Sequence, residues 1–313
     1  MPLNRRRLLQ SVTGLFAGCF SSLGWAAEPK ALAFVATGDW GQEGDTRQKA
    51  VATQMGIAAR RMNSSFVVAV GDNFYDAGVT STSDAHWKVS FEDIYTDPAL
   101  QTPWYAILGN HDYGGSPQAQ IDYSGKSRRW MMPARYYVKS VTLPGGMAAD
   151  LFFIDTSPLI SGYRNSARES NLRANVLGQD GKAQLAWLQA ALAKSTAPWK
   201  LVFGHHPVFS GGEHGDTSDL VRDLKPLLDR YGVQAYVNGH DHDLQHIDRD
   251  GIAYVCTGAG ASVRTVKSVT GTRFARSQVG FTAYRLTPDR LTIDFIDDRG
   301  VLMHSADVPR VRA

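Results

Sequence analysis

The sequence has very little cysteine. Its 313 residues include two cysteines, Cys19 and Cys256. Cys19 falls in the N-terminal stretch that we interpret below as an export signal, which leaves Cys256 without a partner in the mature chain. Cys256 sits in an apolar run and is expected to be a buried structural thiol. An intrachain disulfide is therefore excluded.

The chain also lacks an excess of either charge and, beyond its N-terminus, any long apolar run. No later segment is long and apolar enough to span a membrane. The formal net charge is +3, and Arg5, Arg6 and Arg7 are the only charged residues before Glu28. Without these arginines the chain is formally neutral, so no basic surface is available and we predict no nucleic-acid partner. The sequence contains no internal repeat and no linker that would separate two domains.

The N-terminus has the features of an export signal. The arginines precede an apolar stretch from Leu8 to about Leu23, and small residues follow it. The paired arginines before two leucines resemble a twin-arginine signal, with an ordinary secretory signal as the alternative. A lipoprotein anchor at Cys19 is a further, minor alternative. We predict a signal peptide over residues 1–27, a single domain over residues 28–313, and a periplasmic or secreted protein.

What the sequence does contain is a series of five motifs, each of which carries a side chain that can bind a metal. In chain order they are Gly38-Asp39-Trp40-Gly41, Gly71-Asp72-Asn73-Phe74-Tyr75, Gly109-Asn110-His111-Asp112, Gly204-His205-His206-Pro207 and Gly239-His240-Asp241-His242. A single Gly-Asp pair is typical of a turn. Five such motifs, each behind a strand-like run, indicate a two-metal centre. The donors include no thiolate, which suits iron, zinc or manganese.

The apolar runs before the motifs predict strands that are buried on both faces. These runs are residues 32–37, 66–70, 104–108, 200–203 and 235–237. Helices are predicted over residues 46–62, with Asp45 as the N-cap, and over residues 184–194. This alternation predicts an α/β fold of mixed sheets covered by helices. Because ligands bind outside the carboxyl ends of strands in such sheets, all five motifs can converge at one edge.

Two further segments lead to structural expectations. Residues 281–286 and 291–296 are predicted to form a terminal antiparallel pair of strands. The segment Ser161–Gly181 is long, polar and rich in glycine, asparagine and serine. A loop of that length is typical of a lid or a disordered segment.

The five motifs together resemble the metallophosphoesterase superfamily, and Tyr75 narrows the resemblance to the purple acid phosphatases. Further segments are similar to the small tartrate-resistant acid phosphatase type: residues 91–95, 103–105, 128–130, 207–210, 213–215 and 244–245. The resemblance extends from about Leu32 to the last strands. It implies a sandwich of two mixed β-sheets flanked by helices. In that family the segment aligned with Ser161–Gly181 covers the active site, and whether it regulates access in this chain is left open.

The resemblance also implies a ligand set for Fe(III) and a divalent metal, which would be iron, zinc or manganese. The ferric ion would be held by Asp39, Asp72, Tyr75 and His242. The divalent ion would be held by Asp72, Asn110, His205 and His240. Taken alone, Tyr75 would be interpreted as an aromatic residue packed under its loop. His240 and His242 are two residues apart and would project to one side of a strand-like segment, whereas Asp241 would face away and hold a loop.

The resemblance places His111 and His214 beside the substrate, where they would neutralise developing charge and protonate the leaving oxygen. Taken alone, His214 would be interpreted as a solvated surface histidine. The predicted activity is that of an acid phosphatase, in which two metals about 3–4 Å apart clamp the phosphoryl oxygens and a metal-bound hydroxide attacks phosphorus. A ferric ion acidifies bound water more than a divalent ion does, which favours an acid optimum.

The expected partners are small phosphate esters, with phosphoproteins and nucleotides as further options, and the protein is predicted to be a monomer. Two alternative functions stay open. The first is a phosphodiesterase or nucleotidase with two divalent metals, against which Tyr75 argues. The second is a non-catalytic periplasmic protein that binds metal or phosphate.

Overall fold

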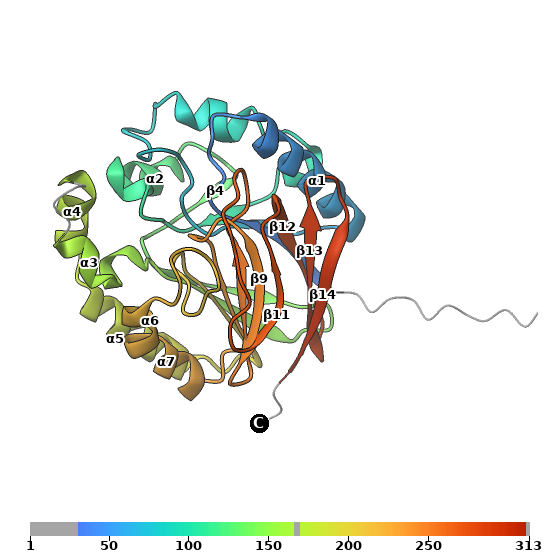
Figure 1. The fold of residues 1–313 in the computed structure, drawn as a ribbon. Coiled ribbons are helices and arrows are strands. Elements are labelled where there is room, and N and C mark those ends of the chain that lie inside the picture. The colour runs from blue at the N-terminus through green and yellow to red at the C-terminus, as the bar shows by residue number, and fades with distance from the viewer. Residues whose placement is uncertain (1–30, 166–169, 311–313) are drawn as a thin grey trace, which may run out of the picture.

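The computed structural model describes residues 31–165 and 170–310. Two seven-stranded mixed sheets pack face to face, and helices cover their outer faces (Figure 1). The predicted α/β sandwich is therefore confirmed. The predicted signal peptide, including Cys19, lies outside the described residues. Among the described residues, none of the helices has the length and apolar character needed to cross a membrane.

The first sheet contains the strands that precede the first three motifs. Its order is β14 (Leu302–Pro309), β13 (Arg290–Asp297), β12 (Gly280–Leu286), β1 (Leu32–Thr37), β2 (Phe66–Ala69), β3 (Trp104–Ala106) and β4 (Trp130–Met131). Strands β1 to β4 are parallel, whereas β1 and β12 are antiparallel. The predicted antiparallel pair near the C-terminus is β12 and β13, but it is not terminal, because β14 follows at the edge of the sheet.

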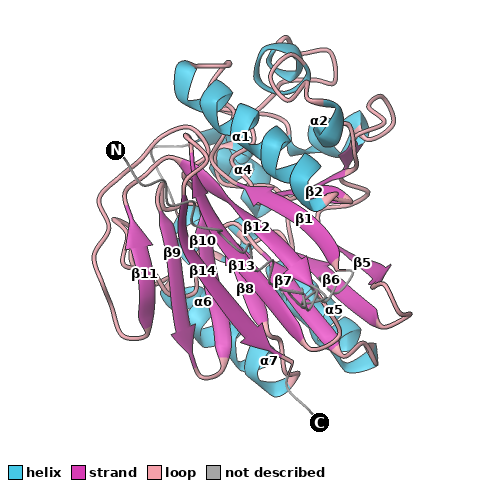
Figure 2. Ribbon diagram, turned by 90° about the vertical axis from the view of Figure 1, so that its right-hand side faces the viewer, coloured by secondary structure: helices cyan, strands magenta, loops and turns pink. Residues whose placement is uncertain are grey.

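The second sheet contains the strands that precede the last two motifs. Its order is β11 (Thr272–Arg276), β9 (Leu244–Arg249), β10 (Ile252–Thr257), β8 (Ala235–Asn238), β7 (Trp199–Phe203), β6 (Ala148–Phe153) and β5 (Tyr137–Thr142). Strands β6, β7, β8 and β10 are parallel to one another. In Figure 2 the strands of the two sheets overlap in projection and run in roughly the same direction.

Helices pack on the outer faces of both sheets (Figure 1). They are α1 (Thr46–Met62), α2 (Pro117–Tyr123), α3 (Ser161–Arg164), α4 (Ser170–Leu177), α5 (Gly181–Lys194), α6 (Ser218–Asp223) and α7 (Lys225–Arg230). The predicted N-cap of α1 is confirmed, since the Asp45 carboxylate accepts a bond of 2.7 Å from the Gln48 amide. Val51, Met55 and Ala59 then lie on the buried face of this helix, at the spacing of one helical stripe.

Aromatic side chains fill the space between the sheets. Phe34 of β1 stacks on Phe66 at 4.9 Å and on Tyr284 at 4.5 Å between ring centroids. Phe153 and Phe203 of the second sheet stack at 5.0 Å, and all of these rings are buried. Offset aromatic pairs of this kind stabilise a core by about 0.5–1.5 kcal/mol beyond the burial of their area. This core fixes the two sheets relative to each other and therefore fixes the edge at which the motifs lie.

The segment Ser161–Gly181 is not a featureless loop, and the prediction of a long loop or disordered segment was wrong for the part described, whereas a role as a lid stays a prediction. It contains α3 and α4, while residues 166–169 lie outside the described residues. Leu172 and Val176, four residues apart, are buried on one face of α4. The Asn175 amide donates bonds of 2.8 and 3.0 Å to the carbonyls of Tyr113 and Gly115. These contacts anchor α4 over the loop that follows His111.

Two histidines meet where the edges of the two sheets face each other. His246 of β9 lies with its Nδ1 3.2 Å from Nε2 of His304 on β14. Burial, with a smaller contribution from His304, lowers the pKa of His246 to about 4, and burial also lowers the pKa of His304. The folded state thus binds fewer protons here than the unfolded chain, whose histidines titrate near pH 6.5. Stability is therefore lost as the pH falls from about 6.5 towards 4.

We expect His246→Phe to reduce this loss of stability in acid. Phenylalanine keeps an aromatic ring beside Phe295 and removes the buried group that resists protonation. The measurement is the thermal unfolding midpoint of the wild-type protein and the variant between pH 7 and pH 4.5. Parallel curves for the two proteins would contradict the expected role of His246.

Candidate metal centre

The five motifs meet at one edge of the sandwich. Asp39, Asp72 and Asn110 follow the parallel neighbours β1, β2 and β3. His205 and His240 follow β7 and β8, which are parallel neighbours in the other sheet. The carboxyl ends of all five strands therefore deliver side chains to a common site, as the sequence predicted.

One group of predicted ligands surrounds the hydroxyl of Tyr75. This oxygen lies 3.0 Å from Asp39 Oδ1, 3.0 Å from Asp72 Oδ2 and 3.0 Å from His242 Nε2. His242 Nε2 is also 3.4 Å from Asp39 Oδ1. All four side chains are buried. Tyr75 is thus not merely packed under its loop, because its polar end points into the cluster.

A second group surrounds His205. Its Nε2 lies 3.2 Å from Asn110 Oδ1 and 3.3 Å from Asp72 Oδ2. Asp72, His205 and His240 each offer a ligand atom within 4.8 Å of the other two. Asp72 Oδ2 therefore contacts both Tyr75 and His205, so the two groups of donors share this one carboxylate.

Hydrogen bonds from neighbouring groups orient the donors. His205 Nδ1 donates to the Val70 carbonyl at 2.9 Å, which leaves Nε2 free to face Asp72. The Ser262 hydroxyl bonds to Nδ1 of His242 in the same way. The second oxygen of each carboxylate accepts a backbone bond, since the amide of His240 donates to Asp39 at 2.9 Å and that of His111 donates to Asp72 at 2.8 Å. The side chains of His205, His242, Asp39 and Asp72 are therefore held in place before a ligand arrives.

The backbone of the site is strained. Asp39, Asp72 and His240 have φ values of 56°, 47° and 70°, in the left-handed region that non-glycine residues rarely adopt. Such conformations cost about 1–3 kcal/mol each and cluster at functional sites. The strain explains how His240 and His242 both reach the site. The prediction of a strand-like segment was wrong here, because residues 239–243 form a turn between β8 and β9.

The charges of the site favour a bound cation. Burial alone would raise the pKa of Asp72, but His205 and hydrogen bonds lower it overall. Burial opposes protonation of His205, yet Asp72 and Asp39 raise its pKa to about 10. Burial and the two carboxylates raise the pKa of Tyr75 well above its usual value. A cation would displace the protons held by His205 and Tyr75, as is usual when metals bind.

The donor set also fits a metal in its geometry. Bonds of about 2.0–2.2 Å to oxygen and nitrogen place neighbouring donors on one ion about 3 Å apart. The donor pairs described above are separated by 3.0–3.4 Å. The Tyr75 hydroxyl has a single hydrogen and cannot donate to both carboxylates beside it. A shared cation would neutralise these buried carboxylates.

The two predicted substrate-side histidines lie at the rim of the site. His111 is half-buried; Nδ1 bonds to the Asp76 carbonyl, and its ring lies 4.5 Å from that of Tyr75. His214 stacks on His240 with ring centroids 4.2 Å apart. Its Nδ1 donates to Asp241 at 2.8 Å. Asp241 also accepts from the Ser210 hydroxyl and the His214 amide, so the expectation that it holds a loop is confirmed.

Sequence reasoning missed several groups that support the site. Asp112, the last residue of its motif, is buried and accepts bonds from the amides of Gly109 and Asn73. Burial and the nearby Asp72 raise its pKa to about 7. His206 lies 2.8 Å from both the Thr156 hydroxyl and the Tyr163 hydroxyl, which connects α3 to the site. The Gly-Asn-His-Asp and Gly-His-His motifs contain both residues, but nothing in the motifs indicates these partners.

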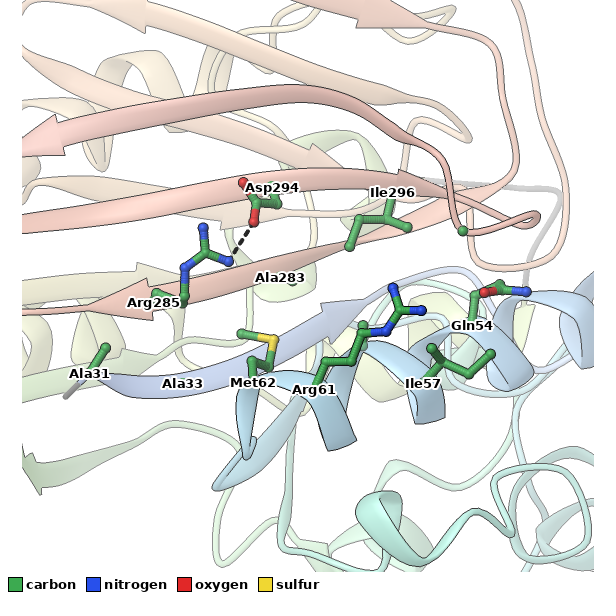
Figure 3. A pocket seen from close by; sticks show the side chains of 12 residues that line it. Ala31, Ala33, Gln54, Ile57, Arg61, Met62, Ala283, Arg285, Asp294 and Ile296 are labelled. Carbon is green, nitrogen blue, oxygen red and sulfur yellow. Dashed lines mark hydrogen bonds and ion pairs between the residues drawn. The ribbon is translucent and has the colours of Figure 1, made fainter. Parts of the chain in front are cut away.

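Two cavities help to locate the reacting centre. A pocket of about 280 Å³ opens beside His111 and Asn110 and is also lined by Asp76, Asn171 and Leu172. A larger cavity of about 510 Å³ lies between α1 and strands β12 and β13 (Figure 3). It contains the Arg285–Asp294 ion pair and none of the motif residues. Of these two, only the smaller pocket is lined by residues of the motifs.

We expect Gly109→Ala to disrupt this centre. A Cβ atom at position 109 would lie 2.1 Å from Asp72 Oδ1 and 2.3 Å from the Asp72 amide nitrogen. Shifting a reacting group by about 1 Å can cost about 10²-fold in rate, so turnover should fall by at least about 10-fold. The measurement is metal content together with turnover. Gly162→Ala, whose Cβ would meet nothing within 4 Å, is the control. Full metal content and turnover in Gly109→Ala would contradict the expected close packing.

Comparison with known proteins identifies the family. Residues 31–244 match the calcineurin-like phosphoesterases. The chain belongs to this family. This calcineurin-like phosphoesterase is 37% identical to tartrate-resistant acid phosphatase type 5 of Mus musculus over 297 residues, covering 89% of this chain and 90% of the mouse protein. It is 40% identical to purple acid phosphatase 7 of Arabidopsis thaliana over 234 residues, covering 74% and 70% of the two chains. The predicted resemblance to these phosphatases is confirmed.

Solved structures show the same fold. One is described as GAP50, the anchor in the inner membrane complex of Plasmodium; it is 25% identical with a TM-score of 0.78, and the match covers 90% of each chain. Another is the purple acid phosphatase PPD1 of Lupinus luteus, which is 14% identical to this phosphoesterase and superimposes with a TM-score of 0.64. The match covers 90% of this phosphoesterase and 54% of the lupin chain. The two-sheet sandwich is therefore the architecture of the family.

Proposed function

We infer that this chain is an acid phosphatase, which hydrolyses phosphate monoesters at a binuclear metal centre. The main observation behind this inference is that two groups of donors share the carboxylate of Asp72. Extensive similarity to tartrate-resistant and purple acid phosphatases supports it. Residues 28–313 would form the single catalytic domain, and the protein would act as a monomer.

The seven donors would hold two ions. A trivalent iron would be bound by Asp39, Asp72, Tyr75 and His242, and a divalent iron, zinc or manganese by Asp72, Asn110, His205 and His240. The contacts around the Tyr75 hydroxyl support the first group, and those around His205 Nε2 support the second. Because burial and two carboxylates raise the pKa of Tyr75, its phenolate requires a strong positive charge. This requirement favours a trivalent ion next to Tyr75.

When bound, the two ions would supply an activated water for attack on phosphorus and positive charge for the phosphoryl oxygens. The protein itself orients the substrate and moves protons. His111 uses Nδ1 to bond to the Asp76 carbonyl and keeps Nε2 for the substrate, whereas His214 uses Nδ1 to donate to Asp241 and its Nε2 contacts Nη1 of Arg264 at 3.2 Å, a contact that a substrate would replace. The two Nε2 atoms would bind the phosphoryl group and protonate the leaving oxygen.

The alternatives fit the site less well. A fold of this kind does not by itself imply catalysis, since one structural relative is described as an anchor. A protein that only bound metal or phosphate would not need two orientated histidines beside the shared carboxylate. A phosphodiesterase or nucleotidase with two divalent metals would not need a phenol in the position of Tyr75.

Substrates and location follow from the same proposal. Small phosphate esters are the expected substrates, with phosphoproteins and nucleotides as further options. The N-terminal features described above would direct the protein to the periplasm or outside the cell, with the twin-arginine route favoured.

The test of the trivalent site is the colour of the protein. A tyrosine phenolate bound to Fe(III) absorbs visible light by charge transfer, so we expect the purified oxidised wild-type protein to be coloured and to hydrolyse p-nitrophenyl phosphate in acid. Tyr75→Phe should bleach or shift the visible band while the circular dichroism spectrum stays unchanged. An identical visible spectrum in the variant would remove Tyr75 from the metal, and a colourless wild-type protein that still turns over would support two divalent metals.

A further inference from the structure

Arg264 is a cation beside the metal centre whose side chain contacts a histidine. Its guanidinium Nη1 lies 3.2 Å from Nε2 of His214. Within residues 31–165 and 170–310, Arg264 has no ion pair with a carboxylate. Arg285, which is also half-buried, does have such a partner and pairs with Asp294 at 2.7 Å. An arginine without an anion, next to a site that binds phosphate, indicates an anion-binding role.

The backbone holds Arg264 at the rim of the metal centre. Its amide donates a 2.7 Å bond to the carbonyl of His242, one of the proposed ligands. The ring of His214, which the guanidinium contacts, stacks in turn on His240. The guanidinium is therefore separated from the second group of donors by a single histidine ring.

Neighbouring contacts fix the loop of Arg264 and leave its charge available. The Lys267 amide donates to the Gly211 carbonyl at 2.9 Å, which joins this loop to the loop of His214. Glu213 precedes His214 on that loop, and its carboxylate accepts a 3.1 Å bond from the Thr265 hydroxyl. Among the described residues, Glu213 therefore forms no ion pair with Arg264.

The side of the metal centre next to Asp76 differs in charge from the side next to Arg264. The pocket beside His111 is lined by Asp76 and by the uncharged Ser170, Asn171 and Leu172, with no lysine or arginine among its described lining residues. As far as the described residues show, the mouth of the metal centre is thus cationic on the side of Arg264 and acidic or neutral on the side of Asp76. A substrate with a second negative charge would direct that charge towards Arg264.

We propose that Arg264 forms an anion-binding subsite which selects phosphate monoesters with a second anionic group close to the scissile phosphate. The substrate class is that of phosphorylated carboxylic acids and diphosphates. The planar guanidinium would exchange its contact with the imidazole of His214 for a bidentate, charge-assisted bond to a carboxylate or phosphate. The proposal rests on the phosphatase function inferred above.

The test compares 3-phosphoglycerate with glycerol 3-phosphate, two alkyl phosphates that differ by a carboxylate in place of a hydroxymethyl group. We expect the wild-type enzyme to have a larger kcat/KM for 3-phosphoglycerate than for glycerol 3-phosphate. Arg264→Gln should lower the ratio of these two kcat/KM values by about 10-fold or more, because it removes a hydrogen bond between charged groups. Lys267→Gln, which removes an equal charge from the same loop, should change the preference by less than about 2-fold. Arg264→Lys should keep part of the preference for 3-phosphoglycerate.

The proposal would be overturned if the wild-type enzyme showed no preference between the two esters. It would also be overturned if Arg264→Gln lowered kcat/KM equally for both esters, or if Lys267→Gln lowered the preference as much as Arg264→Gln does. Binding gives a readout that is independent of turnover. Binding would be measured by calorimetry at fixed ionic strength. Arg264→Gln should weaken the binding of methylenediphosphonate about 10-fold more than it weakens the binding of inorganic phosphate. If the wild-type protein hydrolyses neither ester, the phosphatase function fails, while this comparison of affinities still supports or overturns the subsite.

Discussion

Replacement of Asp72 with alanine is expected to abolish phosphatase activity and to reduce the metal content at both sites. The reason is the position of this carboxylate, whose Oδ2 contacts both Tyr75 and His205, while Oδ1 accepts the amide of His111. No other described side chain contacts both groups of donors in this way, so no neighbouring oxygen can replace it. The variant should therefore lose a ligand of both ions and should also release the loop of His111.

The measurement is elemental analysis of the purified protein together with turnover. His205→Ala is the informative comparison, because His205 contacts Asn110 and Asp72 but not Tyr75, and its loss should deplete mainly the divalent ion. Asp122→Ala, an exposed aspartate on α2, controls for the loss of a carboxylate and should keep both metals. Two full equivalents of metal in Asp72→Ala would contradict the assignment of a shared ligand.

Replacement of either His111 or His214 with asparagine is expected to lower turnover by about 10²–10⁴-fold while both metals stay bound. Both rings bond to protein groups through Nδ1, so Nε2 is the nitrogen that remains for the substrate, which at His214 would replace the contact with Arg264. An alkoxide is a poor leaving group and needs a proton as the bond to phosphorus breaks. The loss should thus be larger for alkyl phosphates than for aryl phosphates, whose phenolate leaves with less help.

Turnover of both substrate types across pH separates proton donation from phosphate binding. A histidine that donates a proton must be protonated, so wild-type activity should decline on the alkaline side, and the variants should lose that limb of the profile. An equal loss on alkyl and aryl phosphates, with the alkaline limb retained, would mean that these histidines bind phosphate and donate no proton.

Sequence alone could predict much of the site because strands and ligands come together in the chain. Near-continuous apolar runs such as Leu32–Thr37 can be satisfied only in a strand covered on both faces. A polar motif directly behind such a run lies at the carboxyl end of that strand. This local rule holds for Asp39, Asp72, Asn110, His205 and His240 alike, so their convergence needed no knowledge of long-range contacts.

Features that depend on distant contacts could not be predicted in this way. Leu172 and Val176 give only a short helical signal within a polar segment, and α4 is stabilised by bonds to the carbonyls of residues 113 and 115. The left-handed conformation of His240 is supported by its amide bond to Asp39, in the other sheet. Arg264 belongs to no motif, and its position beside His214 follows from the pairing of two loops. In each case the information lies in a partner far away along the chain.

His240 and Asp39, whose amide and carboxylate form a hydrogen bond, lie 201 positions apart in the chain. This separation determines when, during synthesis and folding, the metal centre can form. A nascent polypeptide that has reached Tyr75 has two aspartates and a tyrosine of the centre but no imidazole to complete either group. The imidazoles that complete both groups emerge only when about three-quarters of the chain has been synthesised, and they meet the first aspartate only after the two sheets have packed together. Insertion of the ions is therefore a late step that follows folding. A translocase that carries folded proteins can export the finished metalloenzyme, whereas one that threads unfolded chains must leave metal insertion to the destination compartment.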